Sequence, residues 1–251
     1  MKYDDVMKLA LERGFYFPSC EIYSDAQAGF WEYGPAGVSL KNKFLELWRR
    51  ELLRRDKMIE IDGSQIMSSS VFEASGHLTS FADPIVRCTK CKSTHRADRI
   101  ISELAKIEIP ESADLEEFDK VITEKNIKCP KCNSNFENTK KFNMMFQVGI
   151  GPEGEPAYLR PETCQSIFVD FPRLFKTMRG KLPLGIAQTG KSFRNEIAPR
   201  QSLLRLREFY QAEIEVFCNP AKLNDLDKFS EIQDTEIRIQ VNDEVKALTC
   251  K

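Results

Sequence analysis

Two short cysteine pairs constrain the fold of this chain more than any other feature of its sequence. The first pair is Cys88 and Cys91, the second is Cys129 and Cys132, and two residues separate the members of each pair. In a tight turn this spacing lets both thiolates face one point, and two such turns supply the four soft ligands that tetrahedral Zn²⁺ favours. We predict a structural zinc site, because four sulfur ligands leave no open position for catalysis. Two disulfides or free thiols are the alternatives, and we expect His95 to be an ordinary polar residue.

The rest of the composition is that of a folded protein without secretion or membrane signals. With 251 residues and 41% hydrophobic content, the chain can bury one large domain, or one domain and a small insertion. The formal net charge of -1 neither supports nor excludes a nucleic-acid partner. No apolar run is long enough to span a membrane, so we expect a cytoplasmic protein. We expect the remaining cysteines to be buried free thiols: Cys20, Cys164, Cys218 and Cys250.

Helical periodicity appears in several parts of the chain. It predicts a short helix after Asp4 and Asp5 that Gly14 ends, and a long helix that follows a turn at residues 33–37 and runs to about Arg55. The basic side of the long helix is expected to be solvated, with an RNA contact as the alternative. Residues 98–126 form an acidic segment that predicts two helices separated by Pro110. Periodicity makes no prediction for residues 59–86, and it predicts a polar helix at residues 223–251.

Strand patterns dominate after residue 140. They predict strands at residues 142–148, 184–188, 192–197 and 206–217, with a helix at residues 163–171 that Thr163 caps. Because the strands cluster instead of alternating strictly with helices, we predict an α+β fold with a mostly antiparallel sheet flanked by helices. The segment between the cysteine pairs is longer than in compact zinc ribbons, so we expect residues 87–140 to form a zinc-binding insertion with a helical elaboration. Residues 1–86 and 141–251 would then form the core.

The strand at residues 206–217 has two different faces. One carries Leu206, Glu208, Tyr210, Ala212, Ile214 and Val216, and the other carries Arg207, Phe209, Gln211, Glu213 and Glu215. A solvated sheet face explains the second set. An aromatic ring among polar groups, beside a loop that carries Arg194, Glu196, Arg200 and Arg205, also suits a floor that stacks a planar ring and binds phosphates. Residue spacing leaves both interpretations open.

A family resemblance extends this second interpretation. Phe-Arg-Asn-Glu at 193–196, Ala-Pro-Arg at 198–200 and Arg-Leu-Arg-Glu-Phe at 205–209 resemble motif 2 of the class II aminoacyl-tRNA synthetases in its glycyl-specific form. Further matches include Tyr-Gly-Pro at 33–35, Ala-Ser-Gly-His at 74–77, Phe-Ala-Asp-Pro at 81–84, Arg-Ala-Asp at 96–98 and Leu-Arg-Pro-Glu-Thr at 159–163. The resemblance covers most of residues 14–217.

The resemblance implies a role for each matching residue. Arg194 would bind the ATP α-phosphate, Glu196 would contact the adenine side and Phe209 would stack on adenine, so Arg194 and Glu196 are the expected catalytic residues. The rest of the nucleotide site would be Asn195, Leu204, Arg205, Leu206, Arg207 and Glu208. The amino-acid site would comprise Arg96, Glu162, Phe209, Tyr210, Gln211, Ala212 and Glu213. The implied reaction is activation of glycine by ATP with Mg²⁺, followed by transfer to the acceptor end of tRNA(Gly), in a homodimer.

The sequence departs from the family pattern in two places. The family sequence after Pro161 usually reads Glu-Thr-Ala-Gln-Gly, whereas here Cys164 and Ser166 replace the alanine and the glycine. Nothing after Phe217 resembles motif 3, whose arginine meets the γ-phosphate, and no anticodon-binding domain follows. We therefore expect a truncated or split glycyl-specific synthetase that is incomplete at its C-terminus and needs a separate chain carrying motif 3. A non-catalytic synthetase-like protein that acts in dimerisation or nucleic-acid binding is the alternative, and a zinc-dependent binding module is a third.

Overall fold

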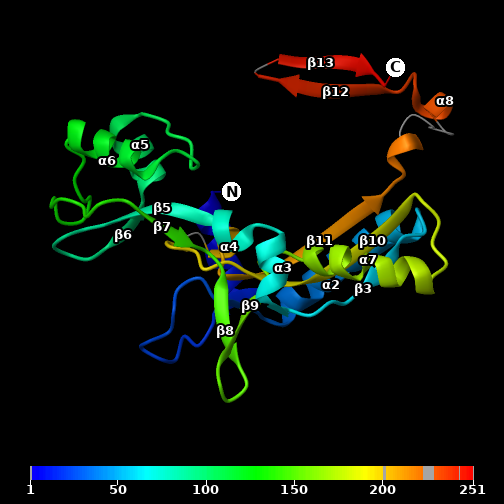
Figure 1. Ribbon diagram of the computed structural model, residues 1–251, viewed down its shortest axis with the longest axis horizontal. Helices are drawn as coiled ribbons and strands as arrows, with labels where there is room; N and C mark the ends of the chain where they lie inside the picture. The colour runs from blue at the N-terminus through cyan, green and yellow to red at the C-terminus, as the bar shows by residue number, and fades with distance from the viewer. Residues whose placement is uncertain (1, 200–201, 223–228, 243, 251) are drawn as a thin grey trace.

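A three-stranded sheet lies at the centre of the molecule. The computed structural model describes residues 2–199, 202–222, 229–242 and 244–250, and Figure 1 traces them. In the central sheet β10 (Leu184–Phe193) pairs antiparallel with β11 (Glu208–Phe217) and parallel with β3 (Ile59–Ile61). Helix α7 (Cys164–Thr177) packs on one face, where Phe171 stacks on Phe217 with their ring centroids 4.0 Å apart. Helix α2 (Pro35–Trp48) lies on the other face, since Lys41 sits 3.9 Å from the centre of the Tyr210 ring.

The N-terminal region follows the predicted pattern. Helix α1 (Tyr3–Glu12) precedes β1 (Tyr16–Pro18), which pairs with β2 (Trp31–Tyr33). The predicted turn at 33–37 is shorter than expected, because Pro35 already occupies the first turn of α2, a position that tolerates its missing N–H. The long helix continues to the expected end, but its last part, Arg49–Arg54, is π-helical. Its basic side is largely paired on the surface, as in the ion pair from Arg49 to Glu60.

A second three-stranded sheet contains β4 (Ile66–Ser68), β9 (Glu155–Leu159) and β8 (Phe146–Ile150), in that order. Two short helices, α3 (Ser69–Ala74) and α4 (His77–Ser80), follow β4. The predicted strand at 142–148 is in fact two strands, because the side chain of Asn143 accepts a hydrogen bond from Met145 N and turns the chain. The first part belongs to β7 (Lys140–Asn143) in a different sheet, and the second belongs to β8.

The segment between the cysteine pairs has a hydrophobic core of its own. Strand β5 (Ala82–Arg87) pairs with β6 (Thr94–Arg96) and with β7, and helices α5 (Ala97–Ala105) and α6 (Leu115–Glu124) follow β6 on either side of Pro110, as predicted. The two helices project from the body in Figure 1. The core is made of buried apolar side chains: Val86, Ala97, Ile100, Ile101, Ile109, Phe118 and Ile127. These contacts agree with an insertion at 87–140, although that division stays a prediction.

Two predictions around the central sheet need correction. The strands expected at 184–188 and 192–197 are one continuous strand, β10, that ends at Phe193. The helix expected at 163–171 extends to Thr177, and Thr163 does not cap it with its side chain. Its hydroxyl instead donates to the carboxylate of Glu213 on β11. Tertiary contacts therefore replace the local signals at both places.

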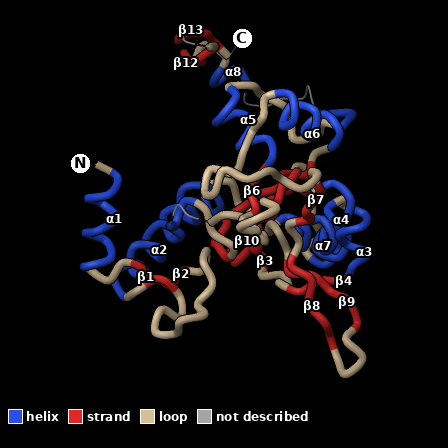
Figure 2. Tube along the Cα trace, turned by 90° about the vertical axis from the view of Figure 1, so that its left-hand side faces the viewer, coloured by secondary structure: helices blue, strands red, loops and turns tan. Residues whose placement is uncertain are grey.

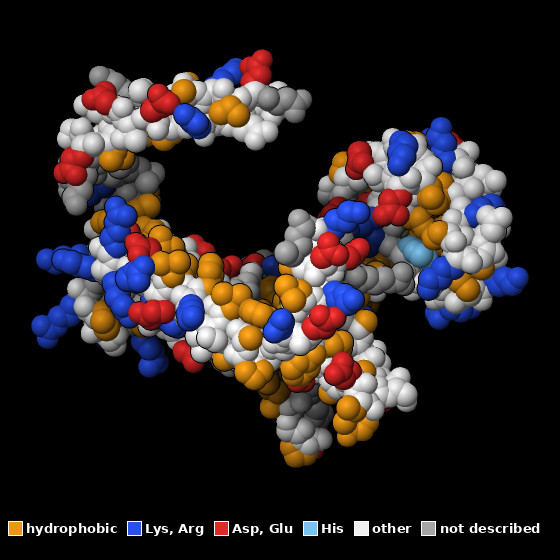
Figure 3. Space-filling view, turned by 180° about the vertical axis from the view of Figure 1, so that it is seen from behind, with side chains coloured by type: hydrophobic (Ala, Val, Ile, Leu, Met, Phe, Trp, Pro, Cys, Tyr) orange, Lys and Arg blue, Asp and Glu red, His pale blue; other side chains and the backbone are white. Residues whose placement is uncertain are grey.

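The predicted C-terminal helix is mostly wrong. Of residues 223–251, positions 223–228, 243 and 251 lie outside the described residues, and only α8 (Phe229–Ile232) is helical among the others. Strands β12 (Glu236–Val241) and β13 (Glu244–Thr249) form an antiparallel hairpin. Alternation of apolar residues at Ile237, Ile239 and Val241 explains the hairpin, because a period of two suits a strand. Figures 2 and 3 show it standing away from the body. Among the described residues, no helix has the length and apolar character needed to cross a bilayer.

Candidate active site

The strands β10 and β11 and the segment before α7 bring together most of the predicted site residues. The register pairs Ser192 with Phe209 and Gln188 with Glu213. The loop between the two strands is closed at its base, where Arg194 N donates to Arg207 O at 2.9 Å. Arg207 in turn donates from its own N–H to Gly29 O at 2.8 Å. Arg200, which the sequence also placed in this segment, lies outside the described residues.

Arg194 lies between two aromatic rings. Its guanidinium carbon is 5.5 Å from the centre of the Phe81 ring and 5.4 Å from that of Phe209, which are distances at which ring faces attract cations. Its Nε donates to Pro161 O at 3.1 Å. Within the described part of the chain, no carboxylate forms an ion pair with this guanidinium. Its charge is therefore available to an anion. The sequence motifs gave Phe81 no role at this site, but its ring is a neighbour of the guanidinium.

Other residues expected at the nucleotide are paired with each other. Arg205 Nε donates to Glu196 Oε2 at 2.7 Å, and both side chains are largely buried. Asn195 is held by its backbone, which donates to Met144 O at 2.8 Å. Glu208 forms an ion pair with Lys191 on the neighbouring strand. Leu204 is 73% exposed, and Leu206 lines a cavity of about 480 Å³ together with Phe209. The described part of the loop thus has a hydrogen-bonded base and an exposed side chain at Leu204.

Two glutamates and a thiol form the polar floor beside Arg194. One oxygen atom from each of Glu162 and Glu213 and the sulfur of Cys164 lie within 4.8 Å of one another. Glu213 Oε2 accepts from Thr163 N at 2.7 Å and from the Thr163 hydroxyl. Burial first, and then the charge of Glu162, raises the pKa of the Cys164 thiol, so the thiol stays protonated. Such a concentration of negative charge favours a cationic ligand.

A third carboxylate belongs to the same patch. Burial raises the pKa of Glu215, and the charges of Glu213 and Glu162 raise it further. Gln211 lies on the same face of β11, and its buried side-chain oxygen has no hydrogen-bond partner among the described residues. The sequence left two interpretations of this face of β11, a solvated surface or a ligand-binding floor. In the structure the face lies toward α7 and the polar floor.

Arg96, also predicted for the amino-acid site, is occupied by carboxylates. Its side chain is 10% exposed and forms ion pairs with Asp83, Asp98 and Glu111. Burial lowers its pKa, but hydrogen bonds to Asp98 and Glu111 and the charge of Asp83 raise it above the usual range. The positive charge of Arg96 is thus already balanced by carboxylates of the described residues, without any substrate.

Tyr210 and Ala212 lie on the opposite side of β11 from Phe209 and Gln211, as the alternation of a strand requires. The Tyr210 ring contacts Lys41 of α2, and its centroid is 6.1 Å from that of Tyr33. Both residues border an apolar cavity that helices α1 and α2 also line. The structure therefore separates these two residues from Glu162 and Glu213.

The two departures from the family pattern have different surroundings. The Cys164 thiol donates to Glu162 Oε1 at 3.3 Å and belongs to the polar floor. Ser166 is buried, and its hydroxyl lies against the backbone of Gly63, where an added Cβ would be 2.2 Å from the oxygen. The glycine therefore accommodates the serine hydroxymethyl group.

Three residues around Glu162 were assigned no role in the site from the sequence. His77, Cys164 and Gln165 each place a side-chain atom within hydrogen-bonding distance of Glu162 Oε1. Glu162 and the last two could have been linked by their spacing at the start of a helix. His77 belongs to the family-matched segment at 74–77, but nothing in its spacing indicated that it would meet Glu162.

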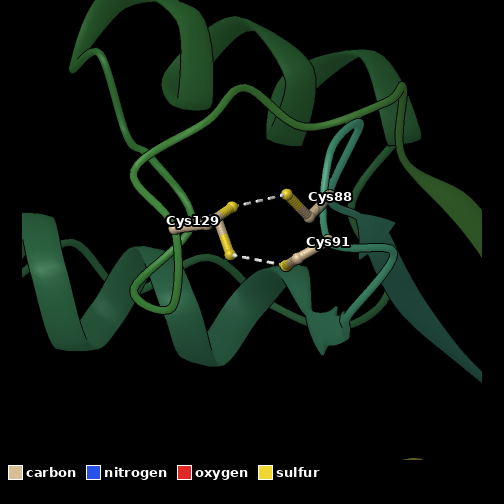
Figure 4. Close-up of side chains that lie close together, drawn as sticks. Cys88, Cys91 and Cys129 are labelled. Carbon is tan, nitrogen blue, oxygen red and sulfur yellow. Dashed lines mark hydrogen bonds between the residues drawn. The ribbon is translucent and has the colours of Figure 1, made fainter.

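The two cysteine pairs meet in the insertion. Cys88 Sγ lies 3.3 Å from Cys132 Sγ, and Cys91 Sγ lies 3.7 Å from Cys129 Sγ. Figure 4 shows the labelled cysteines pointing toward one another from two loops. All four sulfurs lie within 4.8 Å of one another, and no disulfide joins them. Tetrahedral Zn²⁺ with Zn–S bonds of about 2.3 Å requires sulfurs about this far apart, so the donor set fits zinc.

The surroundings of the four thiols differ. Burial raises the pKa of Cys88 to about 11, whereas hydrogen bonds from Ser93 lower the pKa of Cys91. His95 contacts Ser93 and the Phe136 ring. The expectation of buried free thiols elsewhere is half right: Cys20 and Cys218 are free but exposed, and Cys164 and Cys250 are partly buried. Cys20 lies in a turn after β1, and Cys218 directly follows the last residue of β11.

Comparison with known proteins identifies the relatives of this chain. The family model of the tRNA synthetase class II core domain (G, H, P, S and T) matches residues 125–236. The glycine–tRNA ligase of Methanothrix thermoacetophila is 44% identical over 239 residues, which are 95% of this chain and 41% of the relative. The corresponding protein of Pyrococcus furiosus is 45% identical over 239 residues, with the same coverage. The chain thus spans about two fifths of the length of these curated relatives.

Solved structures agree on the fold. The RNA-binding domain of threonyl-tRNA synthetase from Cryptosporidium parvum superposes with a TM-score of 0.50 at 20% identity, covering 89% of this chain and 39% of that one. Prolyl-tRNA synthetase from the same organism, in complex with halofuginone and AMPPNP, also gives a TM-score of 0.50, at 12% identity, covering 94% of this chain and 36% of that one. At such low identity these likenesses show the fold alone.

Proposed function

We propose that this chain, which belongs to the class II aminoacyl-tRNA synthetases and is related to their glycine-specific members, binds ATP and glycine in the site between β10, β11 and α7. The glycine carboxylate attacks the α-phosphorus of ATP, pyrophosphate leaves, and the glycyl group of the adenylate passes to the 3′ end of tRNA(Gly). Because the chain spans 41% of the relative's length, we assign to it only the steps whose residues it contains. A further polypeptide that carries motif 3 is the proposed partner for the complete reaction.

The observation that carries this proposal is that, among the described residues, an arginine without an ion pair lies beside two carboxylates that each have one oxygen without a contact. Arg194 Nε donates to the carbonyl oxygen of Pro161, the residue that precedes Glu162 in the chain. The guanidinium therefore lies near Glu162. Among the described residues, the polar contacts of Glu162 fall on Oε1, and those of Glu213 fall on Oε2. Each carboxylate thus keeps one oxygen for a ligand within the described part of the chain. A glycine ammonium beside the carboxylates and an α-phosphate beside the arginine would satisfy both.

The nucleotide is proposed to enter with Mg²⁺ over the floor that Phe209 provides. Stacking of adenine on the Phe209 ring would replace part of the contact between that ring and Arg194. Glu196 would meet the adenine side while Arg205 holds its carboxylate. Activation of this kind depends on positioning and on charge stabilisation, and it requires no nucleophile from the protein.

The insertion at residues 87–140 is proposed to hold a structural Zn²⁺ through Cys88, Cys91, Cys129 and Cys132. The metal would join the two loops that carry these thiolates and supply no catalytic chemistry. The core is proposed to comprise residues 1–86 and 141–251, with the antiparallel sheet of a class II synthetase. A homodimer and the acceptor end of tRNA(Gly) are the proposed macromolecular partners.

Glycine-dependent exchange of pyrophosphate into ATP tests the proposed function. The chain is assayed alone and together with a polypeptide that carries motif 3, and binding of AMPPNP is measured by calorimetry. We expect Arg194→Ala to weaken AMPPNP binding at least tenfold, because it removes a charged partner of phosphate. The matched control is Arg50→Ala, which removes a surface arginine paired with Glu51. Absence of exchange both with the chain alone and with the motif 3 polypeptide added, together with no AMPPNP binding, would exclude the enzyme function.

A further inference from the structure

A mostly buried histidine stands behind the carboxylate floor. His77 begins helix α4, and its side chain is 15% exposed. Its ring packs between two phenylalanines, with centroids 6.2 Å from Phe72 and 5.4 Å from Phe81. The Asn143 side chain also donates to the His77 carbonyl at 3.1 Å, which fixes the backbone. The imidazole therefore has little freedom to rotate or to leave.

Both ring nitrogens have polar neighbours. Nδ1 lies 2.8 Å from the hydroxyl of Ser75, and Nε2 lies 3.3 Å from Glu162 Oε1. An ionised carboxylate can only accept, so Nε2 must carry the proton if this contact is a hydrogen bond. Neutral Nδ1 then accepts from the Ser75 hydroxyl, which can donate. The two contacts thus select one tautomer, with the proton on Nε2.

Among the described residues, all the polar contacts of the Glu162 carboxylate fall on one of its oxygens. Oε1 accepts from Gln165 Nε2 at 2.7 Å and from Cys164 Sγ at 3.3 Å, and His77 Nε2 approaches it at 3.3 Å. Within the described residues, Oε2 receives none of these donors. Cys164 and Gln165 approach from helix α7, whereas His77 approaches from helix α4. Among the described residues, the histidine is therefore the one partner that ties this carboxylate to an element other than α7.

We propose that His77 is a positioning residue, which holds Glu162 by Oε1 in the Nε2–H tautomer so that Oε2 faces the amino-acid ligand. The inference rests on the proposed function for the identity of that ligand, an amino acid with a free ammonium group. His77 does not touch the ligand. Its Ser75 contact fixes the tautomer, and the two phenylalanine rings fix the plane of the imidazole. Orientation of this kind by a second residue is how sites keep a charged group in a productive position.

Nuclear magnetic resonance tests the tautomer independently of any ligand. The chain contains only two histidines, so ¹⁵N-labelled imidazole signals can be assigned with the single variant His95→Gln. We expect the His77 signal of the full chain at neutral pH to show a protonated Nε2 and an unprotonated Nδ1. Glu162→Gln should shift the Nε2 resonance, because it removes the anionic acceptor. A protonated Nδ1, or nitrogen shifts unchanged in Glu162→Gln, would overturn the proposal.

Ligand binding tests the consequence for the site. The probes are a non-hydrolysable glycyl-sulfamoyl adenosine and AMPPNP, each titrated into the full chain by calorimetry. His77→Phe keeps an aromatic ring between the two phenylalanines but has no Nε2 donor. We expect it to weaken the glycyl probe about tenfold, the low end for a hydrogen bond to a charged group, and to leave AMPPNP affinity within about twofold. His77→Gln, whose amide can reach the Nε2 position, should restore most of the affinity.

The outcomes separate this proposal from the proposed function. Equal affinity of wild type and His77→Phe for the glycyl probe, at an unchanged unfolding temperature, would overturn the positioning role. If His77→Phe unfolds, His77→Gln replaces it, and an equal loss of both probes in that variant would indicate a purely structural residue. If the wild-type chain binds neither probe, the proposed function fails, and the resonance experiment alone decides whether His77 holds Glu162.

Discussion

Removal of one thiol from the four-cysteine cluster should unfold the insertion at residues 87–140 without unfolding the core. Cys91 and Cys129 are 38 residues apart in the chain. Closing a loop of that length by a cross-link stabilises the folded state by about 4 kcal/mol, through the entropy it removes from the unfolded chain. A domain is stable by only about 5–15 kcal/mol in total, and this insertion is much smaller than a typical domain. Loss of the proposed zinc cross-link would therefore remove most of the stability that the insertion can have.

Cys129→Ser is the perturbation, and hydrogen exchange is the assay. We expect metal content to fall, and amide protection in α5 and α6 to fall by about a thousandfold, which is the equilibrium equivalent of 4 kcal/mol. Both tryptophans, Trp31 and Trp48, lie outside residues 87–140, so fluorescence reports the unfolding of the core alone. The matched control is Cys218→Ser, which changes an exposed free thiol outside the cluster.

Two results would refute this reasoning. Unchanged metal content and unchanged protection of α5 and α6 in Cys129→Ser would exclude the four-sulfur site. A fluorescence transition that moves together with the loss of protection would show that insertion and core unfold as one unit. The division at residues 87–140 would then be wrong, even if the zinc site were right.

Three further predictions concern stability. Phe118→Ala should lower the free energy of unfolding of the insertion by about 3–5 kcal/mol, because the ring is fully buried in its core. Urea unfolding followed by hydrogen exchange measures this change, and a loss below about 1 kcal/mol would contradict that packing. Gly190→Ala should lower the unfolding temperature, since the new Cβ would lie 2.2 Å from a guanidinium nitrogen of fully buried Arg160, and an unchanged temperature would show that Arg160 can move. Glu215→Gln should raise the unfolding temperature at pH 7. The folded state raises the pKa of Glu215, so ionisation disfavours folding as pH rises, and the gain should vanish below about pH 4, where the group is protonated in both states; a gain that persists there would have another cause.

The sequence predicted helices and strands well where local pattern and tertiary contact agree. It failed at β10, where two strands were predicted at 184–188 and 192–197 and Gly190 lies between them. In the structure that glycine is in the middle of one strand, because the Arg160 side chain occupies the place of a Cβ. Thr163 shows the same effect: its hydroxyl, which looked like a helix cap, binds Glu213 from another strand. Contacts between distant segments are invisible to a local pattern.

The site residues show a similar division. Alternation in the sequence already placed Tyr210 and Ala212 on the face opposite Phe209, and the structure keeps them there beside α2. Their expected role in binding the amino acid came from the family resemblance and stays a prediction. His77 is the converse case, because a residue that meets Glu162 across 85 positions has no signature in spacing. Sequence patterns can therefore identify faces of an element, but not which face meets which neighbour.

The two glutamates of the polar floor, together with the neighbouring Glu215, connect stability with binding. Glu162, Glu213 and Glu215 lie close enough for the first two to raise the pKa of the third. Their mutual repulsion is a cost that the folded chain carries while no cation is present. A ligand with an ammonium group relieves that repulsion as well as forming its own hydrogen bonds, so binding and folding should be linked through this patch. An amino acid without its charged amine should therefore fail to stabilise the chain, even where it fits the space.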